Sequence, residues 1–258
     1  MNTVSHSRPA YAPGDLAGLL FPQRCPLCDR VLPFDARLKA SLPPAFGPDV
    51  WVHRACHDRL QWVREPSCLR CGRPLADTQA QYCEACEKRR FSFESNTALW
   101  LYRDAARDSV AYFKYHGRRQ NAVYYARALC AAHGAYFKAL NAQALVPVPI
   151  HPSRLIKRGY NQAALLAYQL EKLLGIPCRE DLLIRSKHTS AQKALGRSQR
   201  QQNMENAFRP GKEPKGIHRV ILVDDIFTTG STLEACSRVL KEAGVAEVYS
   251  ITLCIAGE

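Results

Sequence analysis

From about residue 96 onward, short apolar runs alternate with stretches of helical periodicity, and the two patterns predict strands and helices respectively. Strands are expected over 98–102, 182–184, 219–223 and 248–255, and helices over 104–116, 120–140, 161–174 and 231–243. The apolar run 144–150 contains two prolines and is expected to be a strand that gives way to a loop. Strands that alternate with helices predict a mostly parallel sheet with helices on both faces. The expected fold class is therefore α/β.

The region before residue 96 has no such alternation and instead carries pairs of cysteines two residues apart. Seven of the 11 cysteines lie between residues 25 and 86, and a histidine opens one further pair of the same spacing. The pairs are Cys25 and Cys28, His53 and Cys56, Cys68 and Cys71, and Cys83 and Cys86. Tetrahedral zinc takes four such ligands from two tight turns. Eight ligands therefore predict two zinc sites, both structural because neither leaves a position open for water.

Two details of these sites stay open at the level of sequence. His57 competes with His53 as the imidazole ligand, and the pairs can be taken in order or exchanged between the two metals. The isolated cysteines are expected to be small buried side chains; they are Cys130, Cys178, Cys236 and Cys254. The resulting organisation is a disordered tail over 1–19, a double zinc-binding module over 20–95 and a larger domain over 96–258.

The stretch after residue 220 carries the strongest chemical signal. An apolar strand runs into Asp224 and Asp225, and a loop rich in hydroxyl groups opens the next helix; the loop residues are Thr228, Thr229, Gly230, Ser231 and Thr232. Ligands of open α/β sheets bind at the carboxyl ends of the strands, and loop amides, hydroxyls and a helix N-terminus favour phosphate. Two carboxylates beside them suit sugar hydroxyls or a bound cation. The segment therefore predicts a site for a ribose 5-phosphate.

This segment resembles the signature of the type I phosphoribosyltransferases. The resemblance implies that Asp224 and Asp225 contact the ribose 2- and 3-hydroxyls and that residues 228–232 cradle the 5-phosphate of phosphoribosyl pyrophosphate. It also implies that Mg²⁺ accompanies the pyrophosphate. No residue stands out as a base or as the reader of an acceptor nucleobase, so the sequence indicates phosphoribosyl binding more strongly than transfer.

The whole arrangement is similar to ComF-type proteins, which are associated with natural competence and the use of external DNA. The similarity rests on the cysteine pairs, on 111–117, on 146–154 and on Arg158-Gly-Tyr-Asn161-Gln162. His53 stands where this family usually has a cysteine. The resemblance implies single-stranded DNA and competence-machinery proteins such as a helicase as partners.

Further site residues follow from the same resemblance. The proline-rich loop at 147–154 falls where related transferases bind pyrophosphate, so Arg154, Lys157 and Arg158 are expected to supply positive charge there. Asn161 and Gln162 are expected to be site residues, with a helix cap as the alternative. The polar segment 187–206 occupies the position of the flexible catalytic loop, and an ordinary exposed loop is the alternative.

Charge and targeting signals narrow the setting. The chain has 36 Lys and Arg against 23 Asp and Glu, and residues 96–258 carry +10 of its net charge of +13. Such an excess suits single-stranded DNA, on whose bases the aromatic residues of 112–125 are expected to stack, unless they face the core. With no apolar run of about 18 residues and no convincing secretory signal, we expect a cytoplasmic protein without membrane insertion. An active phosphoribosyltransferase of nucleotide salvage and a non-catalytic phosphoribosyl pyrophosphate sensor are the alternative functions.

Overall fold

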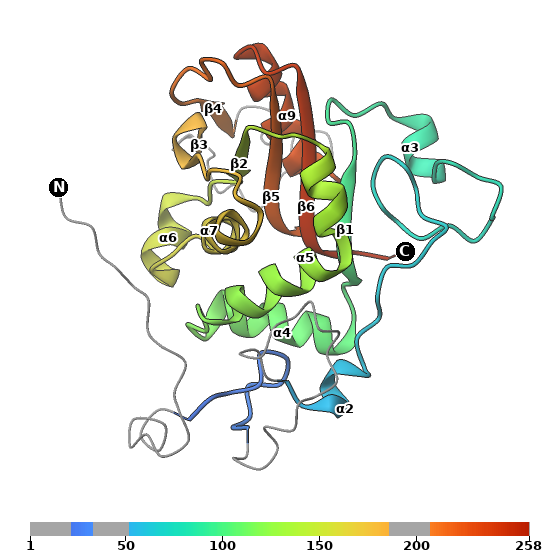
Figure 1. The fold of residues 1–258 in the computed structure, drawn as a ribbon, viewed down its shortest axis with the longest axis vertical. Coiled ribbons are helices and arrows are strands. Elements are labelled where there is room, and N and C mark those ends of the chain that lie inside the picture. Colours follow the sequence, from blue (N-terminus) through green and yellow to red (C-terminus); the bar gives the residue numbers. More distant parts are fainter. Residues whose placement is uncertain (1–21, 33–51, 186–206, 258) are drawn as a thin grey trace, which may run out of the picture.

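The computed structural model describes residues 22–32, 52–185 and 207–257 (Figure 1). The predicted tail at 1–19 and the segment 187–206 lie outside the described residues. The helices are α2 (Arg54–His57), α3 (Glu84–Lys88), α4 (Asp104–Tyr115), α5 (Asn121–Ala139), α6 (Pro152–Arg158), α7 (Gln162–Leu174) and α9 (Ser231–Glu242), with a short 3-10 helix at Glu180–Leu182. The strands are β1 (Asn96–Leu101), β2 (Ala144–Pro147), β3 (Leu183–Arg185), β4 (Phe208–Pro210), β5 (Arg219–Phe227) and β6 (Glu247–Ile255).

A four-stranded sheet in the order β1-β6-β5-β2 forms the centre of the molecule, and all three of its strand pairs are parallel. β5 and β6 are its long central strands, paired from Arg219↔Glu247 to Phe227↔Ile255. β3 and β4 form a separate antiparallel pair. The prediction of a parallel α/β sheet is confirmed.

Side chains on β5 alternate between two buried cores. Ile221 and Val223 join the core that contains α4, α5 and α7, whereas Val220 and Leu222 join the core that contains α9. This alternation follows from the period of two along a strand. Because both faces are covered (Figure 1), β5 reads as a continuous apolar run in the sequence.

The elements differ from the prediction mainly where polar residues continue a strand or where a helix is short. β5 continues four residues past Val223, because Asp224 to Phe227 still pair with β6. Residues 152–154, predicted as part of the loop at 147–154, instead form the first turn of α6. His151 caps it by accepting a hydrogen bond from the Ser153 amide, and Gly159 ends it at φ 75°.

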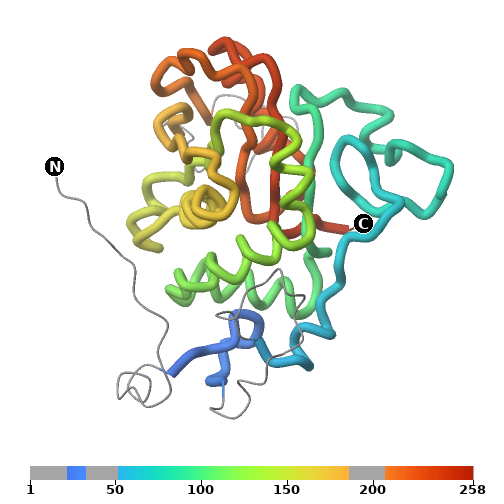
Figure 2. The backbone as a smooth tube through the Cα atoms, viewed as in Figure 1, coloured from blue at the N-terminus to red at the C-terminus, as the bar shows by residue number. Residues whose placement is uncertain are grey.

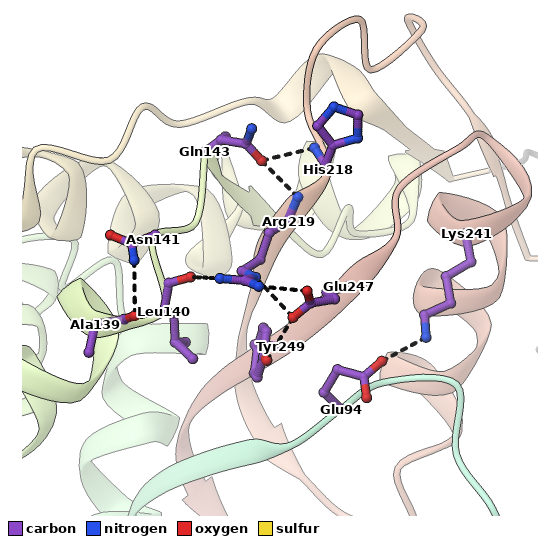
Figure 3. A network of polar contacts seen from close by, with 10 residues as sticks. All are labelled: Glu94, Ala139, Leu140, Asn141, Gln143, His218, Arg219, Lys241, Glu247 and Tyr249. Atoms are coloured by element: carbon purple, nitrogen blue, oxygen red, sulfur yellow. Dashed lines mark hydrogen bonds and ion pairs between the residues drawn. The ribbon is translucent and has the colours of Figure 1, made fainter.

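Polar contacts tie the amino ends of the central strands together (Figure 3). The Arg219 guanidinium donates to both carboxylate oxygens of Glu247, at 2.9 and 2.6 Å, and to the Leu140 carbonyl at 2.5 Å. Gln143 Oε1 accepts from the amides of His218 and Arg219 at 2.9 and 2.8 Å. This network orders the edge of the sheet opposite to the carboxyl ends of the strands.

The cysteine-rich segments pack on both sides of the sheet instead of forming one core of their own. Cys25 and Leu27 belong to the core on the α5 side, whereas Cys68 and Cys71 belong to the core on the α9 side. In Figure 2 the two segments accordingly run along different parts of the molecule, one beside α4 and one beside β1. The boundary at residue 95 stays a prediction.

Candidate functional site

The pleat of β5 directs its two adjacent carboxylates to opposite faces of the sheet. Asp224 follows Val220 and Leu222 toward the α9 side, and Asp225 follows Ile221 and Val223 toward the α4 side. Both sit at the carboxyl edge of the sheet, next to the point where β2 ends at Pro147. One short sequence thus presents two carboxylates to two different environments.

Asp225 forms an ion pair with a residue of α4. Lys114 Nζ lies 2.7 Å from Asp225 Oδ1, and the two side chains are only 16% and 15% exposed. An ion pair sheltered from water is screened less than a surface pair. Lys114 therefore acts as a built-in counter-ion at this edge of the sheet.

Asp224 is in a different electrostatic state. Burial, together with the negative charge of Asp225, raises the pKa of Asp224 to about 7, although its Oδ1 accepts a 2.8 Å hydrogen bond from the Asp225 amide. The nearby positive charges of Lys114 and Arg185 oppose this rise in pKa. The pair consequently holds close to one full negative charge plus a carboxyl group that titrates near neutrality.

Arg185, the last residue of β3, faces the same carboxylate from the α9 side. Its guanidinium lies 5.0 Å from the centre of the Phe208 ring. Its Nε atom is buried and has no hydrogen-bond partner among the residues that the structure describes. Burial and the charge of Arg154 lower the pKa of Arg185. This environment favours the arrival of an anion.

The loop that follows β5 has a tightly constrained backbone. Gly230 adopts φ 75° and is the N-cap of α9. A Cβ atom there would lie 2.8 Å from Phe227 Cζ and 2.9 Å from Phe91 Cε1, so the position strongly favours glycine. Thr229 Oγ1 lies 2.9 Å from Ser231 Oγ and accepts a 3.4 Å hydrogen bond from the Ser231 amide. The loop thus gathers hydroxyls at the amino end of a 12-residue helix.

A cavity of about 420 Å³ brings these elements together. The loop after β5 contributes Thr228 and Thr232, and α6 contributes Arg154 and Arg158 together with Lys157. The remaining lining residues come from four further segments: Lys114, Tyr115, Ile150, Arg185, Asp224, Asp225 and Ile226. Carboxylates, hydroxyls and cations that are far apart in the sequence therefore line one cavity.

Asn161 and Gln162 do not line the cavity. Asn161 Oδ1 accepts from the Ala163 amide and its Nδ2 donates to the Val148 carbonyl, both at 3.1 Å, as expected for the capping alternative. Gln162 is 1% exposed, and its Oε1 accepts a 2.9 Å hydrogen bond from Arg158. Their contact with a ligand stays a prediction, and the present geometry makes them supports of α7 and Arg158.

The first cysteine cluster consists of Cys25, Cys28, His53 and Cys56, whose ligand atoms all lie within 4.8 Å of one another. Cys28 Sγ is 3.3 Å from His53 Nδ1. His57 lies outside the cluster, with Nδ1 3.6 Å from Asp58 Oδ1. The imidazole of the predicted site is therefore that of His53.

The second cluster consists of Cys68, Cys71, Cys83 and Cys86, again within 4.8 Å. The pairs are taken in sequence order, so the exchanged arrangement does not occur. Both clusters are built alike. One pair comes from a turn in which the amide of the first cysteine donates to the carbonyl five residues later, and its carbonyl accepts from the amide four residues later. The start of a short helix supplies the other, with His53 and Cys83 as N-caps.

Both clusters have the donor chemistry of structural zinc sites. Burial raises the pKa of Cys56 and of Cys86 to about 12, and the neighbouring sulfurs add to the rise. Four such donors become a stable set of thiolates when a divalent cation compensates their charge. The composition, three thiols with an imidazole and then four thiols, fits zinc.

Most of the aromatic residues expected to stack on bases are core residues. Phe113, Tyr124 and Tyr125 are at most 2% exposed, so the stacking interpretation is wrong for them and the alternative is correct. Trp100 packs against both tyrosines at 6.0 Å between ring centres. Tyr115 differs, because it is 65% exposed at the cavity, with the Arg158 guanidinium 5.0 Å from its ring centre.

The isolated cysteines follow the prediction in part. Cys236 and Cys254 are fully buried, whereas Cys130 and Cys178 are only partly buried. Among functional residues, the sequence reasoning left Lys114 and Arg185 without a role in the site. Lys114 could have been found, because it lies in the segment 111–117 on which the family resemblance rests, but no sequence pattern points to Arg185.

Comparisons with known proteins agree with this geometry. Residues 157–258 match the family model of the phosphoribosyl transferase domain. The chain is 36% identical over 194 residues to competence protein F of Haemophilus influenzae, covering 71% of this chain and 82% of the relative. The chain belongs to the ComF family. Its α/β fold with a parallel sheet is that of a phosphoribosyltransferase domain, and two cysteine clusters accompany it.

Other ComF-family relatives cover different lengths. Competence protein ComFC of Bacillus subtilis is 27% identical over 237 residues, 89% of this chain and 93% of the relative. The DNA utilization protein YhgH of Escherichia coli K12 is 36% identical over 110 residues, 43% of this chain and 48% of that protein.

A purine phosphoribosyltransferase from Pyrococcus horikoshii is 21% identical with a TM-score of 0.32, over 53% of this chain and 74% of that chain. No helix in the described part of the chain is long and apolar enough to span a membrane.

Proposed function

We propose that the protein binds phosphoribosyl pyrophosphate with Mg²⁺ and takes part in the handling of single-stranded DNA during natural competence, in the cytoplasm. The observation that carries the ligand is the convergence of three chemistries on one cavity of about 420 Å³. Two carboxylates suit a vicinal diol, a hydroxyl-rich loop at a helix N-terminus suits a 5-phosphate, and a basic helix suits a pyrophosphate.

Each group of residues has a defined task in this proposal. Asp224 and Asp225 accept hydrogen bonds from the ribose 2- and 3-hydroxyls, and the amides and hydroxyls of 228–232 bind the 5-phosphate. Arg154 and Arg158, with Lys157, face the pyrophosphate from α6. Mg²⁺, when bound with the ligand, neutralises part of the pyrophosphate charge.

An active transferase of nucleotide salvage is the second candidate, and one observation favours it. Asp224 titrates near neutral pH, which is where a general base works best. Transfer breaks the bond between ribose C1 and the pyrophosphate oxygen and forms a bond from C1 to an acceptor nitrogen, whose proton a base must take. Asp224 lines the cavity and combines a carboxylate with a pKa of about 7, so we assign the role of this base to Asp224.

The DNA role is supported by the surface and by the relatives. Proteins named for competence and for DNA utilization are similar to this chain. Arg154, Lys157 and the exposed Tyr115 lie together at the cavity, and Ile156 of the same helix is 84% exposed. Cations beside an exposed aromatic ring fit a single strand, whose phosphates need charge and whose bases need a stacking surface. Binding of a competence helicase belongs to the same proposal.

We further propose that each cysteine cluster holds one structural zinc ion. Zinc bound by Cys25, Cys28, His53 and Cys56 fixes the first segment against α4, and zinc bound by Cys68, Cys71, Cys83 and Cys86 fixes the second beside β1. Structural zinc contributes on the order of 10 kcal/mol to the folding of such modules.

A calorimetric titration tests the ligand assignment. Phosphoribosyl pyrophosphate with Mg²⁺ should bind the wild-type chain, and Asp224→Ala with Asp225→Ala should abolish binding. Asp108→Ala is the matched control, since that carboxylate is 55% exposed on α4 and lies outside the cavity lining. Absence of wild-type binding would refute the assignment.

A parallel pair of assays separates the functions. Pyrophosphate release in a screen of nucleobases, with turnover by one base, establishes the transferase. Binding of a single-stranded oligonucleotide without turnover by any base establishes DNA handling or phosphoribosyl pyrophosphate sensing instead.

A further inference from the structure

The segment that leaves the second cysteine cluster lies directly beneath the loop that follows β5. Phe91 stacks on Phe93 at 4.8 Å between ring centres, and Phe93 meets Phe227 edge-on at 6.2 Å. A Cβ atom on Gly230 would lie 2.9 Å from Phe91 Cε1 and 2.8 Å from Phe227 Cζ. The turn that carries Gly230 therefore rests on an aromatic support formed by Phe91, Phe93 and Phe227.

A second contact joins the same segment to the first turn of α9. Ser92 donates two hydrogen bonds to Glu234, from its amide at 2.6 Å and from its hydroxyl at 2.8 Å. The Glu234 amide in turn donates to the Gly230 carbonyl at 2.8 Å. The carboxylate of Glu234 is thus held away from the cavity, and the amino end of α9 is fixed against residues 91–92.

The support is continuous with the cysteine cluster. Arg70, between Cys68 and Cys71, donates to the Phe93 carbonyl at 2.6 Å, and its own carbonyl accepts from the Asn96 amide at 2.8 Å. Asn96 Nδ2 also donates to the Cys71 carbonyl at 3.0 Å. Gly72 completes the contact, because a Cβ atom there would lie 2.6 Å from the Asn96 carbonyl oxygen.

We propose that the second cysteine cluster and residues 91–93 are the support that sets the geometry of the 5-phosphate loop, with Phe91 and Ser92 as positioning residues. The proposal rests on the proposed function for its ligand. Loop amides bind a phosphate only if they point at one place. The loop that contains Gly230, which has a left-handed backbone conformation, makes few contacts within itself that would fix the direction of its amides. Loss of the support lowers affinity for the 5-phosphate and leaves the pyrophosphate side, built on α6, unaffected.

Phe91→Ala in the full chain tests this role against a general loss of structure. We expect two zinc ions per chain by elemental analysis, a loss in affinity for ribose 5-phosphate of about tenfold or more, and unchanged affinity for inorganic pyrophosphate. Phe91→Leu, which keeps an apolar contact, should restore most of the affinity. Tyr82→Ala, which removes a 37% exposed ring of the same segment, is the matched control and should bind like wild type.

A second readout needs no ligand. Amide hydrogen exchange of residues 228–234 should accelerate about tenfold or more in Phe91→Ala and less in Ser92→Ala, while exchange in α7 stays unchanged. Zinc chelation of the wild-type chain should accelerate exchange in the same loop.

The outcomes are distinct. The inference is overturned if the amides of 228–234 exchange at the wild-type rate both in Phe91→Ala and in the chelated protein. It is also overturned if Phe91→Ala loses affinity for ribose 5-phosphate and for pyrophosphate to the same extent. If the wild-type chain binds neither ribose 5-phosphate nor phosphoribosyl pyrophosphate, the proposed function fails, and the exchange experiment still decides whether the support exists. If Phe91→Ala does not fold, Ser92→Ala provides the same two readouts.

Discussion

Lys114 Nζ and Asp225 Oδ1 lie 2.7 Å apart, although the residues are separated by more than 100 positions in the chain and sit on different elements. The ion pair places a permanent cation between α4 and the carboxyl end of β5. It offsets the repulsion between Asp225 and Asp224, so that two adjacent carboxylates can share one edge of the sheet. The site therefore carries its own counter-ion before any ligand arrives.

Lys114→Met removes this counter-ion while keeping a long, unbranched side chain. Without it the cavity loses a positive charge, and the pKa of Asp224, which Lys114 lowers, rises further. Ribose 5-phosphate should then bind about tenfold or more weakly by calorimetry, since a charge-assisted contact contributes roughly 1.5–3 kcal/mol. Lys114→Arg should keep most of the affinity, and Lys172→Met on α7 should bind like wild type. Wild-type affinity in Lys114→Met would show that the ion pair has no part in the site.

Asp224 makes stability depend on pH in a direction that can be checked. Its pKa rises from 3.8 to about 7 in the folded protein, mainly through burial, so the folded state binds a proton that the unfolded state has lost. The free energy of unfolding should therefore fall as the pH rises toward 7, by up to ~1.4 kcal/mol per pH unit, and level off above it.

Urea unfolding of the wild type and of Asp224→Asn between pH 5.5 and 8 isolates this effect, because every other titrating group is shared. The stability difference, wild type minus variant, should decrease with rising pH and become constant above about pH 7. A difference that does not change with pH would contradict a raised pKa for Asp224.

The sequence predicted what depends on local spacing and missed what depends on folding. Cysteine pairs two residues apart form their clusters largely through their own turns, so all eight residues of the two clusters could be predicted. The hydrophobic pattern located the central strands but ended β5 at Val223, because Asp224 and Asp225 interrupt the apolar run while the backbone pairing continues. Arg185 could not be predicted, because only the packing of β3 on the α9 side brings it to the cavity.

The choice between His53 and His57 also depends on the fold. Spacing favours His53, which forms a pair with Cys56 of the same spacing as the cysteine pairs, but it does not exclude His57, which directly follows Cys56. The structure separates them through the helix: His53 precedes α2 as its N-cap and faces Cys28, whereas His57 ends α2 and packs against Trp62 at 5.7 Å between ring centres. The direction of a short helix decides which histidine joins the cluster.

Zinc content distinguishes these two histidines directly. Wild-type protein should contain two zinc ions per chain by elemental analysis. His53→Ala should contain one, because the first cluster then has three ligands, and its thermal stability should fall. His57→Ala should retain both. Loss of zinc from His57→Ala, with retention in His53→Ala, would reverse the ligand assignment.

The basic side chains of α6 should make DNA binding depend strongly on salt. Each phosphate neutralised by a cation contributes roughly −0.7 to the slope of log affinity against log salt for a single strand. Arg154→Ala should weaken binding of an oligonucleotide at low salt and reduce this slope by about one contact. Arg54→Ala, with a side chain 85% exposed near the first cluster, is the control and should leave the slope unchanged. An affinity that is flat between low and physiological salt would contradict the electrostatic contribution.

Tyr115 should contribute to DNA binding in a manner that salt does not alter. It is the member of the predicted aromatic stripe that remains 65% exposed at the cavity, and Arg158 lies over its ring, so a base can stack on the free face. Stacking on one aromatic ring contributes about 1–3 kcal/mol per base. Tyr115→Ala should therefore weaken oligonucleotide binding about tenfold at every salt concentration, measured by fluorescence anisotropy. Tyr136→Ala, on the far end of α5 and 42% exposed, should bind like wild type. Equal losses in the two variants would mean that aromatic exposure as such, and not the position beside the cavity, determines the interaction.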